Sequence, residues 1–129
     1  MPSFLTLEDA TFKVVAFCQV TEDFKHEIPA MMFLQTHAKG GSYGASARGF
    51  KKLFERYADG GRAKLPGDVF HEVDKPNGIW EFIKGDLRLF CFFDGATVVL
   101  SHGAIKKSQK VDPSEVSRAV SCKTQYFKK

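Results

Sequence analysis

Three apolar segments joined by two tight turns, between residues 78 and 102, place the strongest constraint on the fold of this chain. The segments are GIWEFIK (78–84), LRLFCFF (87–93) and ATVVLSH (96–102). Gly85-Asp86 and Asp94-Gly95 separate them, and glycine with aspartate between two apolar strands is typical of a hairpin turn. The sequence therefore predicts a three-stranded antiparallel meander.

Helical periodicity dominates the segment from Ser42 to Ala58. Its apolar residues recur at spacings of four and three, which places them on one face of a helix, while the charged residues fall elsewhere. These apolar residues are Tyr43, Ala47, Phe50, Phe54 and Tyr57. Glycine pairs precede and follow the segment, so we expect a helix that ends near Gly60-Gly61.

The remaining segments complete the predicted order of elements. Thr11–Val20 is rich in β-branched and aromatic residues and predicts a strand, and DVFHEV (68–73) predicts a short one. Pro29 favours a break followed by a helix to His37, and Pro113 opens a last helix to about Phe127. We expect one α+β domain over residues 1–129, with the helices packed on one sheet face and the other face open.

Composition and charge narrow the class of protein. With 129 residues, 43% hydrophobic and 26% charged, the chain has the composition of a globular domain. Residues 1–38 carry a net charge of −3 and the rest +7. The basic excess suits a polyanionic partner, although a solvated surface explains it equally well.

The sequence lacks the patterns that are typical of a membrane segment, a disulfide framework or a metal site. No apolar run approaches the roughly 18 residues of a membrane span, and acidic residues stand where a signal peptide would be basic. The three cysteines are widely spaced and the four histidines lack paired ligand spacing. We therefore expect a soluble cytoplasmic protein that has reduced cysteines and uses no metal or cofactor.

Residues 78–119 resemble the RelE/HigB superfamily of bacterial toxins, most closely its phage-derived HigB-like branch. The matching pieces are Trp80-Glu81, Leu87-Arg88-Leu89, Leu100-Ser101-His102-Gly103, Lys106-Lys107, Ser108-Gln109-Lys110 and the helix opening at Pro113. Residues 1–60 match only in the order of elements. Ile83 stands where the family often has an arginine, and Ala104 where it has a phenylalanine.

The resemblance implies a RelE-like fold and a function. The chain would be the toxin of a type II toxin–antitoxin system that cleaves mRNA without a metal, usually on translating ribosomes. Its partners would be the mRNA, the ribosome and a cognate helix-turn-helix antitoxin, and it would meet DNA only through the antitoxin complex. Such cleavage needs cations beside the scissile phosphate and groups that move protons.

Strand alternation combined with the resemblance selects the candidate site residues. If Gly85-Asp86 is a two-residue turn, Glu81, Arg88, Phe90 and Phe92 share the face that we expect to be open. The expected catalytic residues are Arg88, Lys106, Lys107 and Glu81, and the expected RNA-binding residues are Lys84, Lys110, Phe90 and Phe92. A salt bridge between Arg88 and Glu81 is the structural alternative.

Two further residues are weaker candidates. Tyr126 matches the place where some family members keep a functional tyrosine, and core packing or surface exposure is the alternative. A two-residue turn at Asp94-Gly95 would point His102 toward the helices and make it structural. A three-residue turn would place His102 beside Arg88 as a general acid or base. The aspartate-glycine pair favours the tighter turn, while His71 and His37 lack supporting context.

Two other functions remain open at this stage. The chain could be a non-catalytic member of the fold that binds a protein or nucleic-acid partner, which the isoleucine at position 83 favours. It could also be a gyrase-directed toxin, which would need no RNA-cleaving residues.

Overall fold

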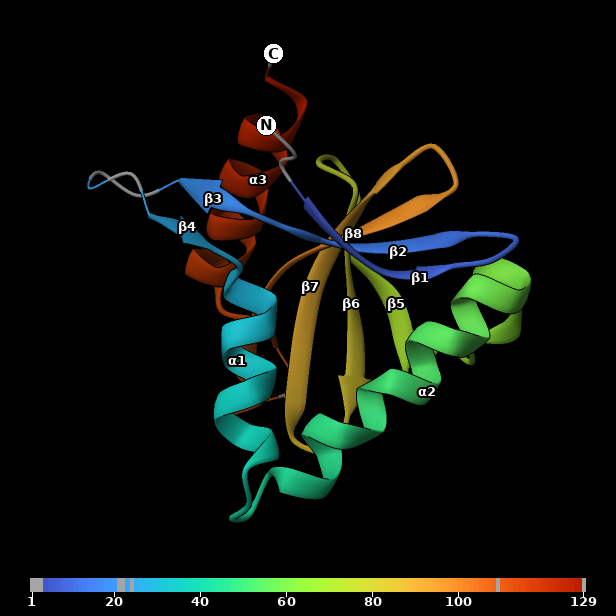
Figure 1. Ribbon diagram of the computed structural model, residues 1–129, viewed down its shortest axis with the longest axis vertical. Helices are drawn as coiled ribbons and strands as arrows, with labels where there is room; N and C mark the ends of the chain where they lie inside the picture. Colours follow the sequence, from blue (N-terminus) through green and yellow to red (C-terminus); the bar gives the residue numbers. More distant parts are fainter. Residues whose placement is uncertain (1–3, 21–22, 24, 109, 129) are drawn as a thin grey trace.

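A six-stranded mixed sheet forms the centre of the molecule, with its strands in the order β1-β2-β8-β7-β6-β5 (Figure 1). The structure is a computed structural model, and it describes residues 4–20, 23, 25–108 and 110–128. Its strands are β1 (Phe4–Asp9), β2 (Lys13–Phe17), β5 (Phe70–Asp74), β6 (Ile79–Lys84), β7 (Leu87–Asp94) and β8 (Thr97–Ile105). A separate small hairpin pairs β3 (Gln19–Val20) with β4 (His26–Glu27). The helices are α1 (Pro29–Ala38), α2 (Gly44–Gly60), a short 3-10 turn η1 (Gly61–Lys64) and α3 (Pro113–Phe127).

The predicted meander is confirmed as strands β6, β7 and β8, and the three predicted helices are present. Strand β1, which pairs antiparallel with β2, was not predicted from the sequence. The parallel pairing of β2 with β8 was not predicted either. Phe4–Asp9 lies at the edge of the sheet and is mostly exposed, so its apolar residues do not alternate strictly with polar ones.

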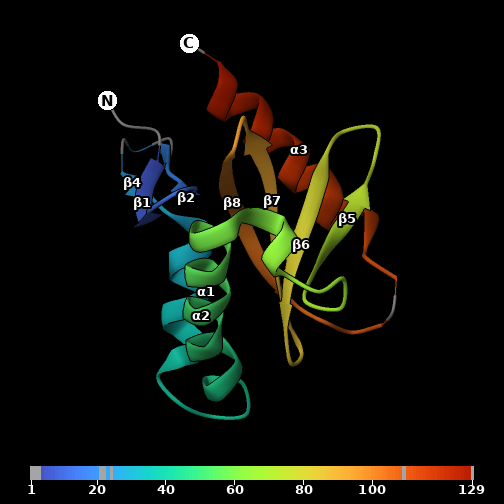
Figure 2. The ribbon, with the colours of Figure 1, turned by 90° about the vertical axis from the view of Figure 1, so that its right-hand side faces the viewer.

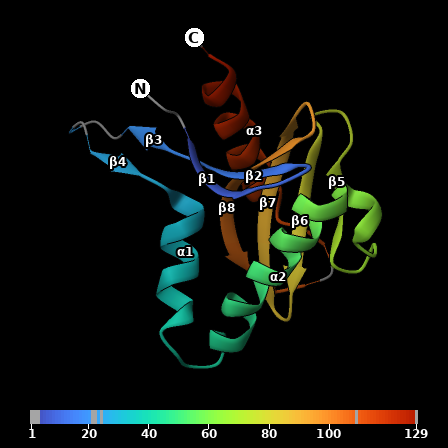
Figure 3. The same cartoon turned by 45° about the vertical axis from the view of Figure 1, so that its right-hand side comes forward.

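One sheet face packs against α1 and α2, as Figure 3 shows. Alternate residues of β6 and β7 point to this face and meet the apolar stripe of α2. Phe82, Leu89 and Cys91 from the strands lie in one core with Phe50 and Phe54 of the helix. Glu81, Arg88, Phe90 and Phe92, which the sequence places together on the other face, are absent from this core, so that grouping is confirmed.

The opposite face is covered by α3, so the prediction of an open face is wrong (Figure 2). Phe90, Phe92 and Val99 form a second core with Ala119 and Cys122 of α3. The helix begins at an N-cap, Asp112, whose carboxylate accepts the backbone N–H of Ser114. Its apolar residues recur at three- and four-residue spacing and bury a surface that would be costly to expose.

A β-bulge at Ser101 changes the register of β8. Asp94 pairs with Thr97, so the turn is Gly95-Ala96, and Cys91 pairs with Leu100. One residue is then skipped, and Phe90 pairs with His102. The bulge moves His102 to the same sheet face as Arg88, so the predicted register, with His102 on the α1 and α2 side, is wrong.

The described helices include none that is long and apolar enough to span a membrane.

Candidate functional site

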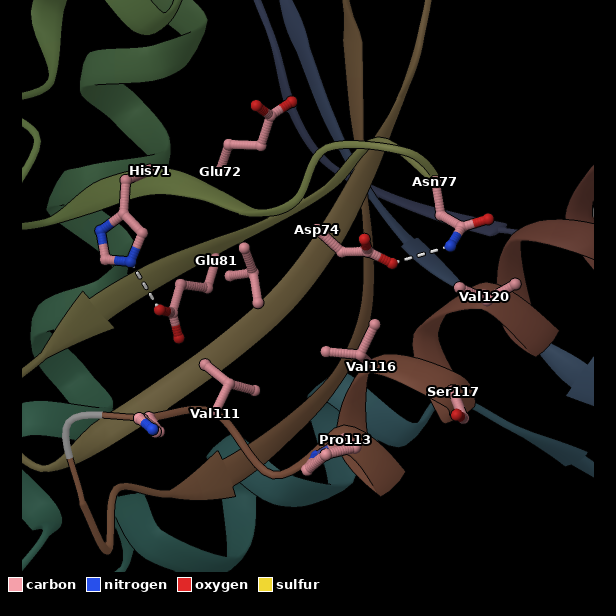
Figure 4. A pocket seen from close by; sticks show the side chains of 12 residues that line it. His71, Glu72, Asp74, Asn77, Glu81, Val111, Pro113, Val116, Ser117 and Val120 are labelled. Carbon is pink, nitrogen blue, oxygen red and sulfur yellow. Dashed lines mark hydrogen bonds and ion pairs between the residues drawn. The ribbon is translucent and has the colours of Figure 1, made fainter.

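A cleft of about 820 Å³ lies between the β5–β6 edge of the sheet and the first half of α3 (Figure 4). Its walls come from three parts of the chain that are far apart in sequence. They include His71, Glu72 and Asp74 of β5, Asn77, Glu81 of β6, Lys110 and Val111 of the loop before α3, and Pro113, Val116, Ser117 and Val120 of α3.

A histidine and a carboxylate face each other in this cleft. His71 and Glu81 are cross-strand partners in the β5–β6 ladder, and Nε2 of His71 lies 2.7 Å from Oε2 of Glu81 (Figure 4). The His71 side chain is 42% exposed, whereas the Glu81 side chain is fully buried. The imidazole is thus held at the cleft surface by a carboxylate that water does not reach.

Arg88 neutralises that buried carboxylate. Its Nη1 lies 2.8 Å from both carboxylate oxygens of Glu81, and its Nη2 donates to the backbone carbonyl of Ser108 at 2.8 Å. The Arg88 side chain is only 5% exposed. A buried carboxylate is tolerated when it is paired and hydrogen-bonded in this way.

Both ring nitrogens of His71 face oxygen atoms that can only accept hydrogen bonds. Nδ1 lies 2.9 Å from the Gly67 carbonyl and Nε2 faces the Glu81 carboxylate. A neutral imidazole has only one N–H. The two hydrogen bonds are therefore made together only when the ring carries both protons.

The basic loop between β8 and α3 lies beside this group. A second cleft, of about 620 Å³, contains Arg88, Lys107 and Glu115, and Lys110 lines both clefts. Lys107 and Lys110 are exposed. Lys106 donates its backbone N–H to the Asp86 carbonyl and lies outside the linings of both clefts. Gln109 lies outside the described residues.

His102 lies on the same face as Arg88, beneath α3. It is 1% exposed and its ring packs against Phe90 with the centroids 5.1 Å apart. Nδ1 lies 2.8 Å from the Ser101 hydroxyl and Nε2 lies 3.2 Å from Glu115. Burial, together with the charge of Arg118, lowers the pKa of His102 from 6.5 to about 4. A neutral ring protonated at Nε2 satisfies both contacts.

The other predicted residues lie elsewhere. Phe90 and Phe92 are fully buried under α3, so the expectation that they lie exposed to stack on bases is wrong. Lys84 lies on the opposite face, against Gly49 of α2. The Tyr126 hydroxyl donates to Asp94 at 2.9 Å, and burial, with this hydrogen bond, raises the pKa of Tyr126 to about 12.

His71 was not predicted as a site residue from the sequence. The available signal was the short strand predicted at residues 68–73, because pairing it with the strand at 78–84 brings a histidine opposite Glu81. Two short segments joined by a loop of unknown turn type do not define that register. Among the described residues, no three His, Cys, Asp or Glu side chains are grouped as a metal site.

The family model described as phage derived protein Gp49-like (DUF891) matches residues 45–123. This range covers more than half of the chain and runs from α2 into α3. It includes every residue that lines the cleft with His71 and Glu81. The search of curated proteins found no match. The chain belongs to the Gp49-like family of phage-derived proteins, which is part of the RelE/HigB-like group of toxins.

Proposed function

We propose that this protein is the toxin of a type II toxin–antitoxin system and that it cleaves mRNA on translating ribosomes without a metal ion. The observation that carries the proposal is the partly exposed His71 held by the buried Glu81–Arg88 pair, at a cleft that Lys110 also lines. A titratable ring oriented by a second group is a common arrangement for moving protons in catalysis.

The proposed reaction uses the RNA as its own nucleophile. The ribose 2′-oxygen bonds to phosphorus, the bond from phosphorus to the 5′-oxygen breaks, and a 2′,3′-cyclic phosphate and a 5′-hydroxyl result. A solvent water molecule takes the proton of the 2′-hydroxyl, and a second proton reaches the departing 5′-oxygen. In our proposal His71 supplies the second proton from Nδ1. A substrate oxygen can replace the Gly67 carbonyl there, because that contact is exposed, while Glu81 keeps Nε2.

The cations divide into two groups. Lys107 and Lys110 are exposed and are our candidates for the phosphate groups. Arg88 is already bonded to Glu81 and Ser108, so we assign it a positioning role instead of direct phosphate contact. It fixes the carboxylate that in turn fixes His71.

Family membership supports an antitoxin as a protein partner. We propose a cognate helix-turn-helix antitoxin, encoded beside this chain, through which the pair would bind DNA.

A second candidate is a non-catalytic or gyrase-directed member of the same family. The pairing of Arg88 with Glu81 favours it, because the charge of Arg88 is neutralised inside the protein. Two further observations favour this second candidate. Helix α3 covers the sheet face that carries Arg88, and an isoleucine, not a cation, lies opposite Arg88 in the β6–β7 ladder.

Expression of the chain in bacteria, followed by mapping of cellular mRNA ends, tests the proposal. We expect growth arrest, with new 5′ ends inside coding regions that disappear when translation initiation is blocked. Growth arrest without new mRNA ends, accompanied by loss of DNA supercoiling, would instead identify a gyrase-directed toxin.

A further inference from the structure

The guanidinium group of Arg62 in η1 lies over two aromatic rings on the α2 side of the sheet. Its guanidinium carbon is 5.1 Å from the ring centroid of Trp80 and 5.7 Å from that of Phe93. These two rings contact each other at a centroid separation of 5.5 Å. Stacking leaves the N–H groups at the edge of a guanidinium free to donate.

No carboxylate is paired with Arg62 within the part of the chain that the structure describes. The residue is exposed, yet the rings beneath it restrict its orientation. An arginine that is oriented but has no acidic partner is suited to an anion from another molecule.

A pocket of about 440 Å³ adjoins this arginine. Its aromatic lining comes from Phe12, Tyr57 and Phe93, with Arg62 on its border. Tyr57 is fixed by its hydroxyl, which donates to the Ala96 carbonyl at 2.7 Å, and Phe12 packs against Tyr57 at a centroid separation of 5.7 Å. The volume falls within the range of roughly 300–1,000 Å³ that is usual for small-ligand sites.

The helix and the turn that end at the pocket are basic over their whole length. Residues 44–64, which form α2 and η1, contain six bases and two acids. The bases are Arg48, Lys51, Lys52, Arg56, Arg62 and Lys64. Such a surface favours a polyanion over an isolated acidic side chain.

We propose that this pocket binds an unpaired nucleotide of RNA, with its base against the aromatic wall and its phosphate on Arg62. The combination of a stacking surface with a planar cation is the chemistry that recognises single-stranded nucleic acid. The pocket lies across the sheet from the cleft. Its lining residue Phe93 faces the α1 and α2 side together with Trp80, whereas Glu81, the neighbour of Trp80 on β6, faces the cleft. The inference rests on the proposed action on RNA and adds a second contact with it.

Binding of a short fluorescein-labelled oligouridylate with 2′-O-methyl riboses tests the inference. This probe cannot be cleaved through its 2′ position, so binding is measured apart from catalysis. Fluorescence anisotropy gives the Kd, and the one tryptophan of the chain, Trp80, reports on the surroundings of Arg62, which lies over its ring. The variants are Arg62→Gln, Arg62→Lys, which keeps the charge, and Lys52→Gln as a control for the loss of one charge on the same basic surface.

We expect Arg62→Gln to weaken binding roughly tenfold, at the lower end of what a hydrogen bond to a charged group contributes, because the variant loses the cation that contacts the phosphate. Lys52→Gln should cost about twofold, Arg62→Lys should fall between them, and saturation of the wild type should change the fluorescence of Trp80. Equal Kd values for Arg62→Gln and Lys52→Gln would overturn the inference. Equal competition by polyglutamate and unlabelled oligouridylate would do the same, because it would show a site that accepts any polyanion.

The two proposals can fail separately. If the wild type binds the probe through Arg62 but cleaves no RNA, the proposed cleavage is wrong and the pocket remains. If RNA is cleaved in a His71-dependent way while Arg62→Gln matches its control in binding, only the pocket is wrong.

Discussion

Arg88 and Glu81 form a buried ion pair on adjacent strands, with the Nη1 atom of Arg88 2.8 Å from both carboxylate oxygens. Both residues lie on one face of the sheet and both are shielded from water. This pair joins two parts of the molecule, because Glu81 holds His71 of β5 and Arg88 holds the Ser108 carbonyl of the basic loop.

Removal of Arg88 should therefore destabilise the fold. In Arg88→Ala the fully buried Glu81 carboxylate loses its cation, and breaking a buried pair costs about 3–5 kcal/mol. Urea denaturation measures this loss. The double variant Glu81→Leu with Arg88→Met removes both charges and should recover most of the stability while His71 loses its partner. A single Arg88→Ala variant as stable as the wild type would contradict the buried pair.

His102 predicts a pH-dependent contribution to stability. Its pKa is about 4 in the folded protein against 6.5 ordinarily, because burial disfavours the charged ring. Above pH 6.5 the ring is neutral in both the folded and the unfolded protein, so its burial costs no stability there. Between pH 6.5 and 4 only the unfolded chain takes up the proton, so up to about 3 kcal/mol is lost. We expect His102→Gln to flatten this part of the profile in urea denaturation at several pH values, and an identical slope in both proteins would contradict the assignment.

Gly103 is required by the close approach of α1. A Cβ atom at this position would overlap the ring of Phe33. Gly103→Ala should therefore lower the free energy of unfolding by about 1–3 kcal/mol. Gly67→Ala is the matched control, since no heavy atom lies within 4 Å of its added methyl group, and it should change stability by less than about 0.5 kcal/mol. Equal effects of the two substitutions on thermal unfolding would refute this packing argument.

The exposed lysines of the loop should determine the salt dependence of RNA binding. Lys107→Gln with Lys110→Gln removes two exposed charges beside the clefts. With two fewer phosphate contacts, RNA binding releases fewer counterions. The slope of log K against log salt should therefore become less steep by roughly two. Anisotropy titrations over a range of salt concentrations measure the slope. An unchanged slope would mean that the loop does not touch RNA.

The alternation of side chains along the two strands β6 and β7 predicted which of their residues share a sheet face at the site. The Gly85-Asp86 turn defined the β6–β7 register, which correctly placed Glu81 and Arg88 on the same face. The salt bridge between them, which the sequence analysis held as the structural alternative, is present. The single-residue bulge at Ser101 could not be predicted, because no composition signal distinguishes it from a regular strand.

Long-range packing accounts for the other errors. The pattern of the last helix was clear, but nothing in the sequence specified which sheet face it would cover. Phe90 and Phe92 were therefore predicted to be exposed, although α3 buries them. His71 was overlooked because its role depends on the pairing of two strands joined by a loop whose turn could not be assigned.

The role of His71 is measured by the cleavage of a defined mRNA in a translating extract. The purified wild type is compared there with His71→Gln and His26→Gln. His26 is exposed and outside the cleft, so it controls for the loss of a histidine. We expect fragments with 2′,3′-cyclic phosphate ends for the wild type and His26→Gln, and a cleavage rate at least about a hundredfold lower for His71→Gln, as expected for a lost proton-transfer group. Equal rates for His71→Gln and the wild type, or no fragments from any of the three proteins, would contradict this expectation.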